Sequence, residues 1–275
     1  MAISQANAVN EIAWGLSNAE RLMIDKASVA TQIAGGVCSL WRATGIPGQG
    51  AIPTTAAVCS KALLGAMGFT NQVGPVKAYM AYAWASAQNA GYAPLVHDRL
   101  AHMGGLNGTL TTSQVCGVDI TLPTSNLPAR IGAADYSDCN WWLEWYTATG
   151  ATVSNATCAV VYNDGTTGNV VVSVPASTAA SRMLPIVSAV TGKFIRSITT
   201  VQLSASTATA GNFGVTATRE RLVMPTDNIA YKRREFTWAQ LGMNAVANDA
   251  CLFPMVDTLT TSSGIIRSQI KMIYV

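Results

Sequence analysis

Residues 139–146, CNWWLEWY, place three of the chain's seven tryptophans within five positions. The aromatic crowding and the Thr-Ala-Thr-Gly that follows favour a strand and a turn over a helix. Alternation with period 2 gives one almost wholly apolar face: Cys139, Trp141, Leu143 and Trp145. The opposite face is half aromatic and half charged: Trp142, Glu144 and Tyr146. A strand with two occupied faces belongs in the middle of a sandwich or at a subunit contact, so the core or assembly candidates are Trp141, Trp142, Trp145 and Tyr146.

The chain is poor in charge. Only 11% of its 275 residues are charged, against roughly 25% in an ordinary soluble domain, whereas 49% are hydrophobic. A free monomer normally keeps a charged surface to stay soluble. The composition therefore favours a protein that buries much of its surface against neighbours, including copies of itself. The alternative is a monomer covered with serine and threonine.

The charges give no sign of a nucleic-acid or membrane partner. Residues 1–105 carry six Lys/Arg and four Asp/Glu, and residues 106–275 carry eleven and ten. The one basic run, Lys232–Arg234, is typical of a solvated loop rather than a polyanion site. No secretory signal opens the sequence, and the longest weakly apolar run, 27–41, falls short of the roughly 20 residues that span a bilayer. We expect a soluble protein made in a cytoplasm.

Residues 1–105 predict a helical N-terminal region. Ser17 and Glu20 have the spacing of a capping box, and apolar residues follow at helical intervals. Further helices are expected to begin near residues 54, 75 and 94, separated by glycine and proline. These helices would be rich in alanine and would pack closely on a partner.

The pattern changes at residue 106 to short β-branched runs broken by Gly, Pro, Asn and Asp. Eight strands are expected: Thr109–Val118, Asn140–Thr147, Thr157–Tyr162, Asn169–Val174, Lys193–Leu203, Phe213–Val223, Cys251–Leu259 and Gln269–Val275. Residues 163–168 predict a hairpin connection between the third and the fourth. The sequence therefore predicts an α+β fold, with a helical region over 1–105 and an antiparallel, jelly-roll-like β-sandwich domain over 106–275.

No catalytic, cofactor or metal site is expected. The six cysteines are scattered without a CxxC motif, so zinc is not indicated and the thiols should behave as small buried hydrophobes. If any cross-link subunits, Cys38 and Cys59 are the candidates, because they lie in the region suspected of making contacts. His97, Asp98 and His102 would diverge on a helix, and are expected to tie its end to the β domain.

A carbohydrate-binding or carbohydrate-cleaving module is the alternative from another class. It would use Trp142, Tyr146 and Asp138, because tryptophans stack on sugars and paired carboxylates cleave glycosides. Asp135 and Asp138 are equally typical of a turn, and alternation turns Trp141 and Trp145 inward. Turn and core are the favoured interpretation.

Several stretches resemble a family of virion structural proteins from tailed bacteriophages. They lie between residues 95 and 225: 97–106, 108–112, 135–138 with 141–146, and 201–207 with 211–219. The resemblance implies a structural virion protein with no enzymatic activity and no catalytic residues. We expect a capsid decoration or minor capsid protein, made in the host cytoplasm and located in the virion. Its expected partners are the major capsid protein and itself, as a trimer by analogy; a neck, tail or fibre component is the alternative within the virion.

Overall fold

The computed structural model describes residues 16–29, 32, 34–121, 130–208, 211–227, 229–242, 244–262 and 264–275. These residues form an almost entirely β protein, with strands β1 to β17 and a short helix, α2 (Trp238–Leu241). No helix in these ranges is long and apolar enough to cross a membrane.

The predicted helical N-terminal region, and with it the α+β fold class, is wrong. Strands occupy this part of the chain: β1 (Glu20–Lys26), β2 (Gly36–Ser39), β3 (Gly45–Ile46), β4 (Ala57–Val58), β5 (Ala78–Ala87) and β6 (Tyr92–Asn107). Strand β6 runs through residue 105, where the composition changes.

Strand β5 shows why the helix prediction failed. Its sequence, AYMAYAWASA, is rich in alanine, which favours helices. However, Tyr82, Trp84 and Ser86 are half-buried, while the alanines between them are buried. This is a period of two, in which the small side chains face the core and the large ones face outward. Helix propensity is a weak preference, and packing of the alanine face overrides it.

The rest of the chain is β as expected. Its strands are β7 (Gln114–Asp119), β8 (Asn140–Trp145), β9 (Ser154–Tyr162), β10 (Thr167–Val174), β11 (Arg182–Ile186), β12 (Ile195–Leu203), β13 (Asn212–Val223), β14 (Arg234–Thr237), β15 (Ala245–Val246), β16 (Leu252–Thr258) and β17 (Ile266–Tyr274). All eight expected strands coincide with one of these, and the hairpin at 163–168 joins β9 to β10. The short strands β11, β14 and β15 were not expected.

A closed sheet forms the centre of the molecule. Its strand order is β13-β8-β11-β2-β16-β6, and β6 pairs again with β13, which closes the ring. The short strand β4 pairs with the part of β6 that β16 does not reach. All of these pairings are antiparallel.

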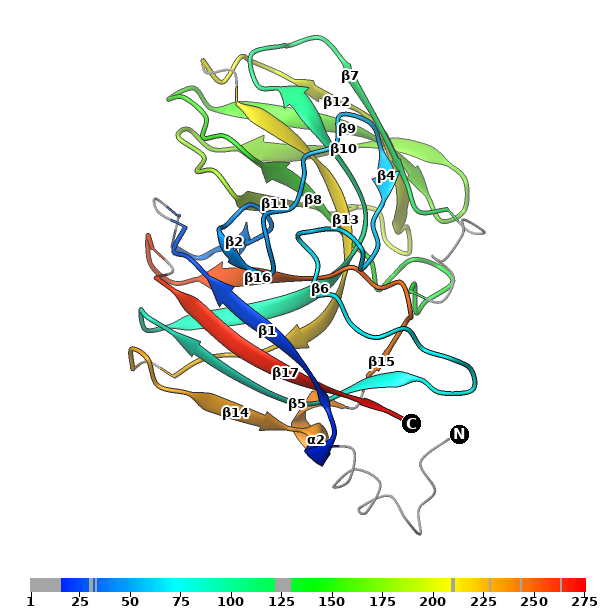
Figure 1. Ribbon diagram of the computed structural model, residues 1–275. Coiled ribbons are helices and arrows are strands. Elements are labelled where there is room, and N and C mark those ends of the chain that lie inside the picture. The colour runs from blue at the N-terminus through cyan, green and yellow to red at the C-terminus, as the bar shows by residue number, and fades with distance from the viewer. Residues whose placement is uncertain are drawn as a thin grey trace.

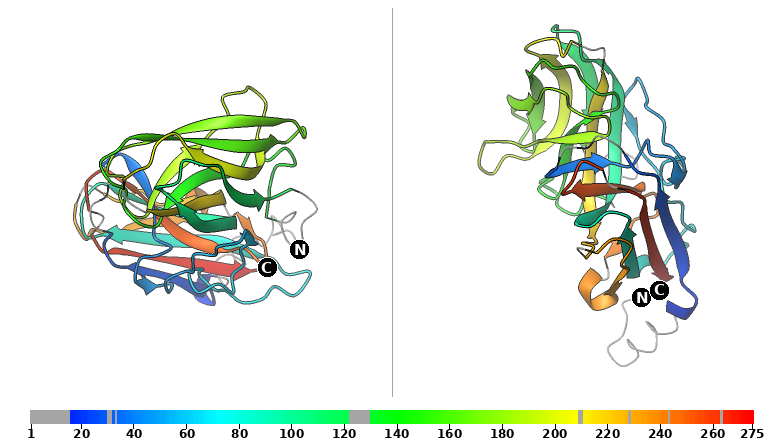
Figure 2. Two further views of the ribbon diagram at one scale, coloured as in Figure 1. Left: turned by 90° about the horizontal axis from the view of Figure 1, so that it is seen from above. Right: turned by 90° about the vertical axis from the view of Figure 1, so that its left-hand side faces the viewer.

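Two further sheets flank the closed sheet, one on each side (Figure 1). The first has the order β10-β9-β12-β7, and the second has the order β14-β5-β17-β1-β3 with β15 beside β5. The three layers give an elongated molecule when it is viewed from the side (Figure 2). Because the central sheet lies between the other two, both of its outer sides are buried.

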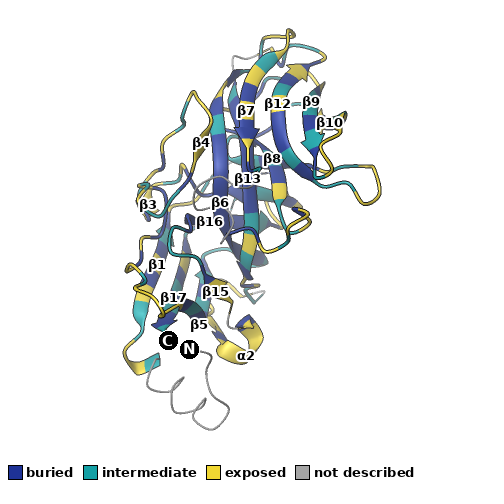
Figure 3. Cartoon of the chain, turned by 90° about the vertical axis from the view of Figure 1, so that its right-hand side faces the viewer, coloured by how far each residue is buried: buried dark blue, intermediate teal, exposed yellow. Residues whose placement is uncertain are grey.

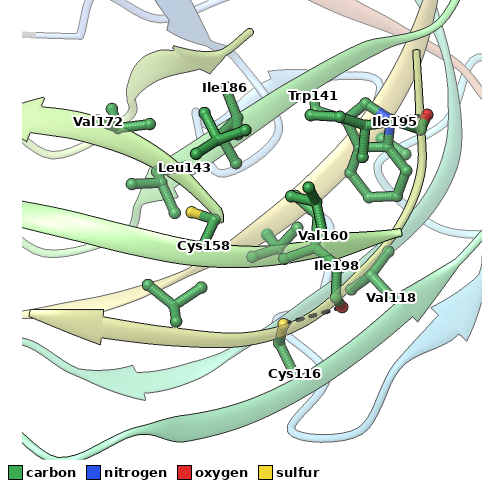
Figure 4. Packing of buried hydrophobic residues seen from close by; sticks show 14 of the residues in the cluster. Cys116, Val118, Trp141, Leu143, Cys158, Val160, Val172, Ile186, Ile195 and Ile198 are labelled. Carbon is green, nitrogen blue, oxygen red and sulfur yellow. Dashed lines mark hydrogen bonds between the residues drawn. The ribbon is translucent and has the colours of Figure 1, made fainter. Parts of the chain in front are cut away.

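Each layer contact has its own apolar core. Residues of β8 and β13 pack against β7, β9, β10 and β12, with Trp141 and Leu143 beside Val160 and Ile198 (Figure 4). A second core lies between the closed sheet and the β14-β5-β17-β1-β3 sheet. A third cluster includes Trp41, Phe253 and Met255. The N-terminal strands therefore contribute to the same continuous fold as the C-terminal ones.

Strands β6 and β13 approach so closely at Gly214 that only glycine fits. A Cβ atom at Gly214 would lie 1.9 Å from the Met103 carbonyl oxygen and 2.6 Å from the Cα of Gly104. We expect Gly214→Ala to lower the free energy of unfolding by about 1–3 kcal/mol, because both atoms are backbone and cannot turn aside. Urea denaturation measures this loss. Gly68→Ala is the control, since its nearest atom would be 3.9 Å away; equal stability of the two variants would contradict the close approach.

Candidate assembly surface

Strand β8 places the tryptophan-rich stretch as the alternation predicts. Trp141, Leu143 and Trp145 are 3%, 0% and 0% exposed and face the core between the closed sheet and the β10-β9-β12-β7 sheet. Trp145 stacks on Phe213 with ring centroids 4.5 Å apart. These side chains are part of the chain's own core and are not available to a partner.

The other face of β8 carries a buried ion pair. Glu144 pairs with Arg99 of β6, and both side chains are almost fully buried. Glu144 Oε2 also accepts hydrogen bonds from Thr216 Oγ1 at 2.7 Å and from the Tyr146 hydroxyl at 3.1 Å. Burial alone would raise the pKa of Glu144, but the charge of Arg99 and hydrogen bonds from Arg99, Ser39 and Thr216 outweigh it and hold that pKa below its usual range. The network joins β6, β8 and β13.

Asp98, next to Arg99, makes a second buried ion pair. Arg130 donates to both of its carboxylate oxygens, from Nε at 2.9 Å and from Nη2 at 2.5 Å. The backbone N–H of Cys251 donates to Asp98 at 2.8 Å. The helix expected around Asp98 is wrong, because residues 92–107 form strand β6. Asp98 and Arg99 nevertheless connect β6 to later parts of the chain.

His97 lies on the same strand in an apolar setting. Its side chain is 2% exposed, its Nδ1 is 3.1 Å from Thr218 Oγ1, and its ring meets Trp142 edge-on at 6.4 Å. Burial lowers the pKa of His97 to about 4. The histidine is therefore neutral at neutral pH.

We expect His97 to make the fold acid-sensitive. Between its folded pKa and its ordinary value the unfolded chain binds more protons, so stability falls as pH falls through that window. The loss should reach roughly 2–3 kcal/mol at about pH 4.5 relative to about pH 7.5. Urea denaturation at the two pH values tests this, with His97→Gln as the control that removes only this titration. If the variant kept the full pH dependence, His97 would not be its source.

The residues proposed for a carbohydrate site all make contacts within the fold. Trp142 lines a cavity of about 390 Å³ together with Trp141, but both indole N–H groups are already bonded, to Thr218 Oγ1 and to the Ile195 carbonyl. Tyr146 belongs to the Arg99–Glu144 network. Asp138 pairs with Arg219 at 2.6 Å and accepts from the Gly132 N–H. The three positions are committed to contacts within the fold.

The two candidate cross-linking thiols are both internal. Cys38 and Cys59 are 0% exposed. Burial raises the pKa of Cys38 to about 11, so its thiol stays protonated at neutral pH. In the folded chain neither sulfur reaches the surface where a second subunit could meet it.

One edge of the β14-β5-β17-β1-β3 sheet is open. Strand β1 pairs with β17 along its whole length, from Glu20 to Lys26. On its other side β3 reaches only Asp25 and Lys26. Within the residues that the structure describes, no strand pairs with that side of β1 between Glu20 and Ile24.

An apolar groove runs beside this open edge. It encloses about 410 Å³ and is lined by Arg21, Leu22, Met23, Ile46, Pro47, Gly48, Leu64, Ala66, Met67 and Gly68. Its large apolar side chains are unusually exposed: Met23 38%, Ile46 56% and Leu64 72%. Figure 3 shows β1 and β3 at the margin of the molecule, surrounded by exposed residues. Below we call this surface the β1 groove.

The β1 groove is preformed, because buried side chains hold its walls. Lys26 is 0% exposed, and its ammonium donates to the carbonyl oxygens of Ala43, Pro47 and Gly48 at 2.9, 2.6 and 3.3 Å. Burial lowers the pKa of Lys26 to about 8. Trp41 is 1% exposed, and its indole N–H donates to the Ala51 carbonyl. Lys26 and Trp41 therefore fix residues 43–51, which contribute Ile46, Pro47 and Gly48 to the wall of the groove.

This arrangement can bind an extended polypeptide. The open edge of β1 offers backbone hydrogen bonds, and the groove offers apolar contact for alternate side chains of the incoming strand. The sequence interpretation missed the surface because it predicted helices that begin at Ser17 and near residue 54. Burial alternates along β1, but in its sequence, ERLMIDK, the three apolar residues are consecutive, so the sequence carries no alternation that could have revealed the strand.

No metal site is visible: the described residues contain no group of three or more His, Cys, Asp or Glu side chains placed to hold an ion. No protein-family model matches the chain, and no curated protein matches it.

The chain is weakly similar to solved structures of infectious bursal disease virus particles. A crystal structure of the VP2 subviral particle is 11% identical, with 93% of this chain and 79% of that chain covered, at a TM-score of 0.17. A structure of the Gt strain is 10% identical, with 94% and 80% covered, at a TM-score of 0.18. Folds do not superpose at such scores, so the similarity carries no argument about this chain. The resemblance to virion proteins of tailed bacteriophages stays a prediction.

Proposed function

We propose that the chain is a structural protein of a virus particle and that it works by binding neighbouring subunits. The observation that carries this proposal is the β1 groove, where an open strand edge lies beside exposed Met23, Ile46 and Leu64. Monomeric proteins usually protect such an edge with charges or cover it. In a chain with only 11% charged residues, the cover is most simply a segment of another subunit.

The three-layer fold suits this work. Two apolar cores join the closed sheet to the flanking sheets, and buried ion pairs fix β6 within the closed sheet, which gives a rigid body for binding neighbours. We place the protein on the shell, as a capsid decoration or minor capsid protein of a tailed bacteriophage, bound to the major capsid protein. A neck, tail or fibre position is the alternative. Self-association as a trimer is part of the proposal and is measured by light scattering.

Gradient purification of particles followed by quantitative mass spectrometry tests the function. We expect the protein to sediment with the particles and to resist a high-salt wash, because apolar and backbone contacts are little screened by salt. Hundreds of copies in each particle fit the shell, whereas a few dozen or fewer fit the neck or tail. Recovery of the protein only at the top of the gradient would refute a structural role.

A further inference from the structure

The third apolar cluster contains two cysteines, Cys59 and Cys251. Cys59 follows β4 and Cys251 precedes β16, and both are 0% exposed. Both are attached to the same stretch of β6: the Cys59 N–H donates to the Leu100 carbonyl at 2.9 Å, and the Arg99 N–H donates to the Cys251 carbonyl at 2.9 Å. The two sulfurs are in hydrogen-bonding contact.

A buried ion pair fixes the backbone of both cysteines. Arg130 Nη1 donates to the Cys59 carbonyl at 2.5 Å. Its partner Asp98 accepts from the Cys251 N–H at 2.8 Å. One arginine and one carboxylate therefore hold the two residues next to each other along the edge of β6 that β4 and β16 share.

A histidine sets the polarity of the pair. Arg99 Nε donates to His102 Nδ1 at 2.9 Å, which leaves Nε2 as the ring's N–H donor. His102 hydrogen-bonds to the Cys59 sulfur, and Arg99 adds a positive charge nearby. Trp41 packs edge-on against the His102 ring at 5.6 Å and keeps it in place.

These contacts distinguish Cys59 from the other thiols. Burial opposes ionisation, but the hydrogen bonds from Cys251 and His102 and the charge of Arg99 favour it, and the pKa of Cys59 lies well below its usual value. The pKa of Cys251 is raised by burial and by its hydrogen bond to Cys59. Cys59 is therefore the more readily ionised of the two sulfurs, and Cys251 is the thiol that can resolve an oxidised partner.

We propose that Cys59 and Cys251 are a redox-active pair that hydrogen peroxide converts into an internal disulfide. The Cys59 thiolate attacks the O–O bond, which forms a sulfenic acid and releases hydroxide. The Cys251 sulfur then attacks the sulfenic sulfur, forms the S–S bond and releases water. In total two thiols are oxidised, one peroxide is reduced and two waters leave.

Access comes from β4, the weakest part of the closed sheet. This strand has two residues, both exposed, and pairs with β6 at Ala101 and His102 only. Its separation from β6 would uncover Cys59 without opening the layer cores. Formation of the disulfide would then hold the chain near β4 to the chain before β16, along the edge of β6 that both contact.

The test uses the full-length chain, purified under reducing conditions and exposed to hydrogen peroxide under native conditions. We expect an intact-mass loss of two hydrogens, a Cys59–Cys251 peptide in non-reducing peptide mapping, and a higher thermal midpoint that dithiothreitol reverses. The internal control is Cys116 and Cys158, which are buried with pKa values raised by burial, to about 11 and about 12. Oxidation of these thiols before Cys59, or no Cys59–Cys251 linkage after prolonged exposure, would overturn the proposal.

Two variants separate the steps. Cys251→Ser should stop at the Cys59 sulfenic acid, which a dione probe traps, and Cys59→Ser should leave Cys251 unreactive. His102→Gln should move the pH profile of Cys59 alkylation to higher pH, a change that a purely structural role of His102 would not produce. An unchanged profile in a folded His102→Gln protein would contradict the assigned polarity.

Discussion

Replacement of Arg99 with methionine is expected to lower the free energy of unfolding by about 3–5 kcal/mol. The substitution keeps most of the side-chain volume but leaves the Glu144 carboxylate buried, without the charge that offsets its desolvation. It also removes the guanidinium from its contacts with the Trp41 and Phe253 rings, whose centroids lie 4.6 and 5.1 Å from it. Denaturant unfolding, followed by tryptophan fluorescence, measures the loss.

Two controls show whether the charge or the volume is responsible. Arg267→Met breaks the exposed ion pair with Asp25, whose side chains are 53% and 48% exposed, and should cost no more than about 1 kcal/mol. The double variant Arg99→Met with Glu144→Leu should recover much of the loss, because it removes the unpaired carboxylate. If Arg99→Met cost no more than Arg267→Met, the buried pair would not hold the closed sheet together.

A charge placed in the β1 groove is expected to prevent assembly without unfolding the chain. Leu64 is 72% exposed, so Leu64→Asp changes the isolated fold little. Once a neighbouring subunit covers the groove, the new carboxylate must lose its water without a partner, which costs several kcal/mol. Since each 1.4 kcal/mol is about tenfold in affinity, incorporation into particles should fall by about a hundredfold or more.

The matched control is Val171→Asp on β10, in the flanking sheet on the far side of the closed sheet. Val171 is 62% exposed, so the chemical change and the exposure are similar. Both variants are compared with the unaltered chain by the amount of protein in gradient-purified particles, after circular dichroism has shown that both fold. Equal loss in the two variants would mean that the β1 groove is not a specific contact.

The strands of the C-terminal part could be predicted because their pattern is local. In β8 the alternation of Trp141, Leu143 and Trp145 with polar or half-buried neighbours is visible in the sequence and remains in the fold. The hairpin between β9 and β10 is likewise set by the turn residues Asp164 and Gly165.

The N-terminal strands could not be predicted from local helix or strand propensity, because they form through pairing and packing with residues far away in the sequence. The alanines of β5 are buried only because β17, almost two hundred residues later, pairs with that strand. In the sequence, His97 and Arg99 are typical of the surface of a helix. In the fold they are buried on β6, because Trp142, Glu144 and Thr218 of other strands contact them. The β1 groove has the same origin, since Met23, Ile46 and Leu64 meet only in the folded chain.

A three-dimensional map of the intact particle, at a resolution that shows side chains, tests the central claim most directly. We predict that the chain is found in the particle, that an extended segment of a neighbouring subunit continues the sheet beside Glu20–Ile24, and that this segment covers Ile46 and Leu64. A map in which the chain is placed and the β1 groove faces solvent in every copy would contradict assembly through this surface. A map of the complete particle with no density for the chain would contradict the structural role itself.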